Sequence, residues 1–193
     1  MSSDLTNQKR ALRAELRERR RNMTATELEA AEEGITRNLV DLTTELGATS
    51  VACYLSTTDE PNTRPYLNWA YQNDVRVLLP VSRDDGLLDW IISDGESEVE
   101  GLLGLPEPVG ELVGPIAIND VDLIIVPASA VDAQGVRMGW GRGYFDKTLG
   151  SMEKCPPVYA VLFDAEVVEQ VPRETHDQPV NGVVTPTRIV RFT

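Results

Sequence analysis

The chain has 193 residues, 41% of them hydrophobic and 25% charged, and these proportions exclude disordered and collagen-like classes. Its 31 acidic residues outnumber its 18 basic residues, and the net charge of −13 argues against a broad nucleic-acid-binding surface. We therefore expect a single domain, residues 1–193, that binds no nucleic acid.

Neither a membrane span nor a secretory signal is predicted. No stretch reaches the roughly 18 apolar residues that a span needs, and residues 1–30 are charged where a signal peptide would be apolar. We expect a cytoplasmic protein without membrane partners. The two cysteines, Cys53 and Cys155, form no ligand cluster and are interpreted as structural thiols.

Residues 4–21 lack Gly and Pro and are rich in Ala, Leu, Arg and Glu, which predicts a helix. Helical periodicity puts Lys9 and Arg13 on one side of it, together with Arg17 and Arg20. This basic segment of an acidic chain either binds an anion or pairs with the protein's own acids. The arginines near its end are expected to form a solvated face or to pair with neighbouring acids: Arg17, Arg19, Arg20 and Arg21.

The next segment, from Thr24 to Glu27, has the spacing of a capping box. It precedes a second predicted helix over residues 28–46, which ends near Gly47. The chain is therefore expected to open as a helical hairpin.

Segments of strand length follow the second helix, and the apolar run at residues 123–126 is typical of strands buried on both faces. A crossover helix is predicted over residues 62–72, and the Glu-, Gly- and Pro-rich residues 94–114 are predicted to form a surface loop. The fold class is α/β, with three α/β/α layers and a mostly parallel sheet after the hairpin. The predicted strands are residues 50–55, 75–81, 87–92, 123–127 and 158–163.

The segment from Asp122 to Asp146 carries the clearest chemical pattern. A buried strand leads into a loop with four glycines, and such loops turn backbone amides toward phosphate. Arg137 and Arg142 supply positive charge, and Asp146 stands one turn into the next predicted helix, where a carboxylate can hold magnesium against nucleotide phosphates. A tight turn with Asp146 as a helix cap is the alternative, because the spacing matches neither the P-loop nor the dinucleotide fingerprint.

Several segments resemble, in order, those of the 5-formyltetrahydrofolate cyclo-ligase family. The string RMGWGRGYFD at residues 137–146 is similar to the family's R-L-G-x-G-x-G-Y-Y-D hallmark. Residues 9–13 resemble its opening K-x-x-L-R helix, residues 54–63 its Y-x-S-x-x-x-E-x-x-T loop, and residues 176–186 its ending. A looser match over residues 100–108 precedes the hallmark, so that the resemblance covers nearly the whole chain.

The resemblance implies a reaction in which ATP and 5-formyltetrahydrofolate give 5,10-methenyltetrahydrofolate, ADP and phosphate, with Mg²⁺ as cofactor. It implies an iminium phosphate intermediate, formed when the formyl oxygen attacks the terminal phosphoryl group. It implies catalytic roles for Arg137, Arg142 and Tyr144 and metal ligation by Asp146 and Asp177. We expect a monomer or a weak homodimer with small-molecule substrates.

The family's binding residues fall on two groups of positions in this chain. The positions implied for folate are Ser56, Glu60, Trp90 and Tyr144. Those implied for ATP are Lys9, Arg13, Arg137, Met138, Gly139, Trp140, Gly141, Arg142, Gly143, Tyr144, Phe145 and Asp146.

Two functions of other classes stay open. An RNA-binding module would use the basic helix, and a sugar-phosphate isomerase or transferase would share the α/β fold. The acidic composition and the joint presence of Lys9, Arg137 and Asp146 favour a nucleotide site over both. His176, the only histidine, is interpreted as a loop residue because no nucleophile pattern accompanies it.

Overall fold

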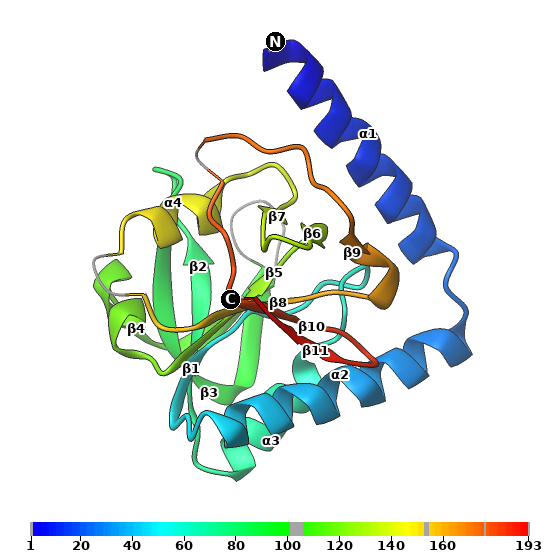
Figure 1. Ribbon diagram of the computed structural model, residues 1–193. Coiled ribbons are helices and arrows are strands. Elements are labelled where there is room, and N and C mark those ends of the chain that lie inside the picture. The colour runs from blue at the N-terminus through cyan, green and yellow to red at the C-terminus, as the bar shows by residue number, and fades with distance from the viewer. Residues whose placement is uncertain (1, 101–105, 153–154, 176, 193) are drawn as a thin grey trace.

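The computed structural model describes residues 2–100, 106–152, 155–175 and 177–192. It opens with two helices, α1 (Ser2–Arg21) and α2 (Ala25–Glu45), as predicted. The Thr24 side chain accepts a hydrogen bond from the backbone N–H of Glu27 at 3.1 Å, which confirms the capping box. Figure 1 shows the helices diverging from their short connection, so that each packs against a different part of the molecule.

An eight-stranded sheet forms the centre of the molecule, in the order β11-β10-β8-β5-β1-β2-β3-β4. Neighbouring strands from β10 to β2 run parallel, whereas β11, β3 and β4 at the two ends pair antiparallel. The strands are β1 (Ser50–Ala52), β2 (Arg76–Ser82), β3 (Leu88–Glu100), β4 (Pro106–Val113), β5 (Leu123–Pro127), β8 (Val158–Val161), β10 (Gly182–Val184) and β11 (Ile189–Arg191). The helical segments after α2 are α3 (Arg64–Gln72), η2 (Pro115–Asp120), α4 (Tyr144–Gly150) and η3 (Asp164–Glu166).

Alternating strand residues supply two hydrophobic cores, one on each face of the sheet. Val51 packs with Leu39 of α2 and with α3, whereas its neighbour Ala52 packs on the other side with Leu149 of α4 and with η2. Helical elements therefore cover both faces, which confirms the three-layer fold and the mostly parallel sheet. Helix α3 connects the parallel strands β1 and β2, as the predicted crossover helix should.

A second, three-stranded sheet lies beside the first, in the order β7-β6-β9. Leu16 of α1 packs against this sheet, in a core that includes Met138. Helix α1 is thus fixed to the part of the chain that contains the glycine-rich loop, and α2 to the large sheet. The strands of the small sheet are β6 (Ala130–Asp132), β7 (Arg137–Met138) and β9 (Val167–Val168).

The prediction of a surface loop over residues 94–114 is wrong. Strands β3 and β4 extend through most of this segment and pair with one another, with a register shift between Ser93 and Glu98. Gly95 supplies the positive φ of 80° near this irregularity. The prolines of β4 fit its position at the edge of the sheet, because an edge strand has one side whose N–H groups make no hydrogen bonds to a neighbouring strand.

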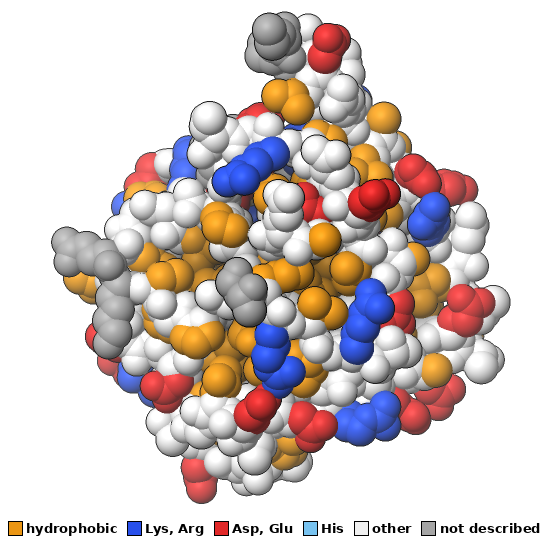
Figure 2. All heavy atoms as spheres, viewed as in Figure 1, with side chains coloured by type: hydrophobic (Ala, Val, Ile, Leu, Met, Phe, Trp, Pro, Cys, Tyr) orange, Lys and Arg blue, Asp and Glu red, His pale blue; other side chains and the backbone are white. Residues whose placement is uncertain are grey.

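Acidic and basic side chains both occur on the face seen in Figure 2. Within the described part of the chain, no helix combines the length and apolar character of a membrane crossing. Both cysteines are free; Cys53 is buried, which raises the pKa of its thiol to about 12, and Cys155 is exposed.

Candidate active site

A cavity of about 450 Å³ opens where segments far apart in the sequence meet. Helix α1, the segment after β1, the loop between β7 and α4, and the segment before β10 all contribute to its walls. The cavity brings together most of the residues predicted for the site: Lys9, Arg13, Glu60, Arg137, Gly139, Trp140, Gly141, Arg142, Gly143, Tyr144, Phe145, Asp146 and Asp177.

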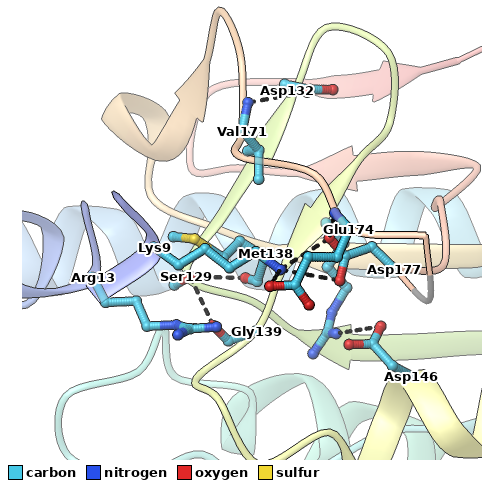
Figure 3. A network of polar contacts seen from close by, with 11 residues as sticks. Lys9, Arg13, Ser129, Asp132, Met138, Gly139, Asp146, Val171, Glu174 and Asp177 are labelled. Atoms are coloured by element: carbon cyan, nitrogen blue, oxygen red, sulfur yellow. Dashed lines mark hydrogen bonds and ion pairs between the residues drawn. The ribbon is translucent and has the colours of Figure 1, made fainter. Parts of the chain in front are cut away.

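Two cations project from consecutive turns of α1 into this cavity (Figure 3). Lys9 is only 6% exposed, and its Nζ lies 3.0 and 3.3 Å from the two carboxylate oxygens of Asp177 and 3.5 Å from Glu174. One turn later, Arg13 Nε donates to the carbonyl oxygen of Gly139 at 2.8 Å. The helix is therefore joined by its cations to both the glycine-rich loop and the segment before β10.

Arg137 is the most deeply buried cation of the predicted site. Its Nε donates to the carbonyl oxygen of Pro127 at 2.8 Å, at the carboxyl end of β5, and its Nη1 lies 3.5 Å from Asp146 Oδ1. Burial lowers the pKa of Arg137, and the charge of Asp146 opposes that shift. Because arginine is charged at any ordinary pH, Arg137 presents a fixed positive charge at the cavity floor.

The loop between β7 and α4 is held in shape by left-handed glycines. Gly141 has φ 95° and Gly143 has φ 75°, a region that side chains with a Cβ seldom adopt. Ser129 fixes the start of the loop, since its Oγ donates to the carbonyl oxygens of Met138 and Gly139 at 2.8 and 3.1 Å. Arg142 lies exposed on this loop at the mouth of the cavity.

The arginines at the end of α1 divide between the two predicted alternatives, a solvated face and pairing with acids. Arg17, Arg19 and Arg21 are exposed, but Arg20 is 6% exposed and pairs bidentately with Glu166 at 2.6 and 2.9 Å. Its guanidinium also lies 4.8 Å from the ring centre of Trp140. The signal was present in the helical periodicity, which puts Arg20 on the same side of α1 as Lys9 and Arg13.

The opposite wall of the cavity comes from the segment after β1 and from β2 and β3. Glu60 lies on this wall, and its Oε1 accepts a hydrogen bond from the backbone N–H of Thr57 at 2.9 Å. Burial raises the pKa of Glu60, and that hydrogen bond opposes the shift. Tyr54, to which the sequence assigned no role, lines the same wall together with Pro80 and Leu88.

Three predicted residues do not line the cavity. Trp90 is fully buried in the core under the sheet, and Met138 packs in the core beneath α1. Ser56 is buried and organises its loop, because its Oγ donates to Asn62 Oδ1 and accepts from the Thr63 N–H, both at 3.2 Å. His176 lies outside the described residues.

Among the described residues, no three His, Cys, Asp or Glu side chains gather closely enough to bind a metal ion by themselves. Magnesium in nucleotide sites needs only one or two carboxylates, because phosphates and water complete its shell. Asp146 fits that requirement, since its carboxylate lines the cavity beside Arg137. Asp177 fits less well, because both of its oxygens already accept from Lys9.

Asp132, which no motif singled out, supports the segment that carries Glu174 and Asp177. It is 3% exposed, and its Oδ2 accepts from the backbone N–H of Val171 at 3.1 Å. Its Oδ1 accepts from the N–H groups of Gln134 and Val136 at 2.9 and 3.0 Å. A single buried carboxylate therefore ties the turn before β7 to the chain that reaches Lys9.

Comparisons with known proteins agree on one family. The model of the 5-formyltetrahydrofolate cyclo-ligase family matches residues 5–186. The 5-formyltetrahydrofolate cyclo-ligase of Mycolicibacterium smegmatis is 34% identical over 75% of this chain and 77% of its own, and that of Escherichia coli K12 is 31% identical over 90% and 98%. The solved structure of Aquifex aeolicus 5,10-methenyltetrahydrofolate synthetase is 29% identical with a TM-score of 0.79, covering 95% of this chain and 92% of that one.

Proposed function

Since the chain belongs to the 5-formyltetrahydrofolate cyclo-ligase family, we propose that it uses ATP to cyclise 5-formyltetrahydrofolate. The products are 5,10-methenyltetrahydrofolate, ADP and phosphate. The formyl oxygen attacks the γ-phosphorus, and the bond from that phosphorus to the bridging oxygen of ADP breaks. The second folate nitrogen then adds to the formyl carbon of the resulting iminium phosphate, loses its proton, and phosphate departs with the former formyl oxygen.

Positioning and charge neutralisation carry most of the catalysis in such a phosphoryl transfer. Lys9 and Arg13 would bind the ATP phosphates, with Lys9 exchanging part of its contact with Asp177 for a phosphate oxygen. Arg137 would neutralise the charge that develops on the transferred group, and Arg142 would do so from the mouth of the cavity. Residues 138–146, with their left-handed glycines, would enclose the phosphate chain.

Asp146 is the residue that would hold magnesium, with Asp177 as the second candidate. Bound magnesium would offset the charge of the β- and γ-phosphates. The Arg137 side chain keeps Asp146 oriented toward the cavity through their 3.5 Å contact.

Folate would bind on the wall that carries Glu60. A carboxylate there can accept hydrogen bonds from the nitrogen donors of the pterin ring. Tyr144 would lie near the reacting formyl group, and its hydroxyl at present donates to the carbonyl oxygen of Arg83 at 3.4 Å. Ser56 would act indirectly, by shaping the Glu60 loop, and Trp90 by packing beneath the wall.

One observation carries the proposal: Lys9 and Arg13 reach the same cavity as Arg137 and Asp146, although about half the chain or more separates them in sequence. Structural ion pairs alone would not require a cavity between them. A nucleotide site requires both the charges and the space.

The test is a spectrophotometric assay near pH 7 that follows methenyltetrahydrofolate absorbance with 5-formyltetrahydrofolate, magnesium and ATP. We expect ATP-dependent product formation by the wild type and a loss of about 100-fold or more in Asp146→Asn. Asp41→Asn, an exposed aspartate on α2, is the matched control and should keep wild-type activity. A wild-type protein that binds ATP but forms no methenyl product would refute the proposed reaction.

A further inference from the structure

Tyr54 carries a polar group that the protein itself leaves unsatisfied. The residue follows β1 and is 4% exposed, and its hydroxyl has no hydrogen-bond partner among the described residues. Tyr54 also lines the cavity. Buried polar groups are almost always paired. Of the described residues that line the cavity, Tyr54 is one of two with an unpaired buried side-chain atom, the other being Trp140, so its hydroxyl is a candidate for a hydrogen bond to a ligand.

Tyr66 shows that the same fold pairs a buried phenol where no ligand is expected. It is fully buried in the core between α2 and the sheet, outside the cavity lining. Its hydroxyl lies 2.7 Å from the Thr43 Oγ1. Of these two buried phenols, the unpaired one belongs to a residue that lines the cavity and the paired one does not.

The surroundings of Tyr54 favour the protonated phenol, which can donate a hydrogen bond. Burial and then the charge of Glu60 hold the pKa of Tyr54 well above its ordinary value, so that the phenol keeps its proton. Glu60 stands on the same wall of the cavity, with one oxygen fixed by Thr57. This wall thus presents a carboxylate that accepts hydrogen bonds beside a phenol that donates one.

That pair of groups matches one edge of a 4-oxo pterin ring. The edge carries the N–H donors of the 2-amino group and N3 next to the C4 carbonyl oxygen, which accepts. We propose that the Tyr54 hydroxyl donates a hydrogen bond to the C4 carbonyl oxygen of the folate substrate. Glu60 would accept from the adjacent N–H donors of the pterin. This inference rests on the proposed function and makes Tyr54 a specificity-determining residue for the pterin.

Tyr54→Phe removes only the hydroxyl. We expect the KM for 5-formyltetrahydrofolate and its Kd measured without ATP to rise by about tenfold, with the KM for ATP within about twofold of wild type. The melting temperature without ligand should stay level or rise, because no internal hydrogen bond is lost. Tyr66→Phe is the matched control: it should lower the melting temperature and leave the folate Kd unchanged.

A second arm identifies the atom that Tyr54 contacts. The folate analogue with an amino group in place of the C4 oxygen is bound to wild type and to Tyr54→Phe. If the Tyr54 hydroxyl contacts the C4 oxygen, the affinity lost through Tyr54→Phe and the affinity lost through the change at C4 are not additive. Additive losses would overturn the inference. An unchanged folate Kd in Tyr54→Phe would also overturn it, and an inactive wild type would instead refute the proposed function.

Discussion

The charged groups on the two walls of the cavity have different surroundings. The helix wall, formed by Lys9 and Arg13 of α1 with Arg137 and Asp146, has each of these charges in contact with a protein partner. The strand wall, formed by Tyr54, Glu60, Pro80 and Leu88, leaves a buried hydroxyl unpaired and a carboxylate with a raised pKa. Under the proposed function, the helix wall would bind charged ligands by exchanging ion pairs, and the strand wall would bind a neutral ring that supplies the missing hydrogen bond.

The difference follows from the energetics of burial. An uncompensated buried charge is far more costly than an uncompensated hydroxyl, so the cations of the helix wall need partners before any ligand arrives. A phosphate can then replace a carboxylate as the partner of Lys9. A single unpaired phenol is tolerated at lower cost, and its missing bond favours ligand binding.

The largest expected effect comes from Arg20, which connects the two walls. It pairs with Glu166, donates to the carbonyl oxygen of Asp59 at 3.3 Å on the strand side, and lies against Trp140 on the helix side. Arg20→Met leaves Glu166 buried without its cation, which should lower the free energy of unfolding by about 3–5 kcal/mol. Thermal unfolding should show a melting temperature lower by roughly 6–20 °C.

Arg19→Met is the matched control for this prediction. Arg19 pairs with Glu15 one turn away, and both side chains are 57% exposed, so the loss should stay below about 1 kcal/mol. Equal destabilisation by the two variants would show that Arg20 does not join the walls.

Arg137 tests whether the charges of the helix wall serve chemistry as well as structure. Arg137→Met keeps an apolar stem against Phe145, whose ring centre lies 5.7 Å from the guanidinium carbon. We expect kcat to fall by about 100- to 1,000-fold with both substrates saturating, because a charge aimed at the transferred phosphoryl group is lost. Arg37→Met, a change at an exposed residue of α2, is the control and should leave kcat unaltered. A wild-type kcat in Arg137→Met would show that Arg137 has only a structural role.

The sequence predicted the helix wall better than the strand wall, for physical reasons. Glycine spacing and charged residues at helical intervals are local features, and they pointed to Lys9, Arg13 and residues 137–146. Whether a hydroxyl has a partner depends on residues distant in the chain, so the unpaired Tyr54 could not be recognised. Helical periodicity put Arg20 on the same side of α1 as Lys9 and Arg13, but its burial could not be predicted, because its partner Glu166 lies 146 positions further along.

The strands of the fold also differ in how well the sequence predicted them. The fully apolar strand at residues 123–127 was predicted with its correct bounds, because burial on both faces leaves a continuous apolar run. Strands β3 and β4 were missed beyond residue 92, since a polar pair of strands at the end of a sheet resembles a loop in composition. Strands β6, β7 and β9 have only two or three residues each, too few for any periodicity.

The smallest expected effect concerns Glu60, whose substitution should raise the stability of the protein, whereas most substitutions lower it. Burial raises its pKa above the ordinary value of 4.5, so the folded state binds this proton more tightly than the unfolded state does. Ionisation of Glu60 therefore begins to cost stability as the pH rises through 4.5, and the whole cost is present above the raised pKa. Glu60→Gln avoids that cost and should raise the melting temperature at pH 7 by roughly 2–4 °C, equivalent to about 1 kcal/mol. The gain in melting temperature should disappear below pH 4.5, and the affinity for folate at pH 7 should fall. A gain that is independent of pH would mean that burial of the Glu60 carboxylate does not destabilise the folded protein.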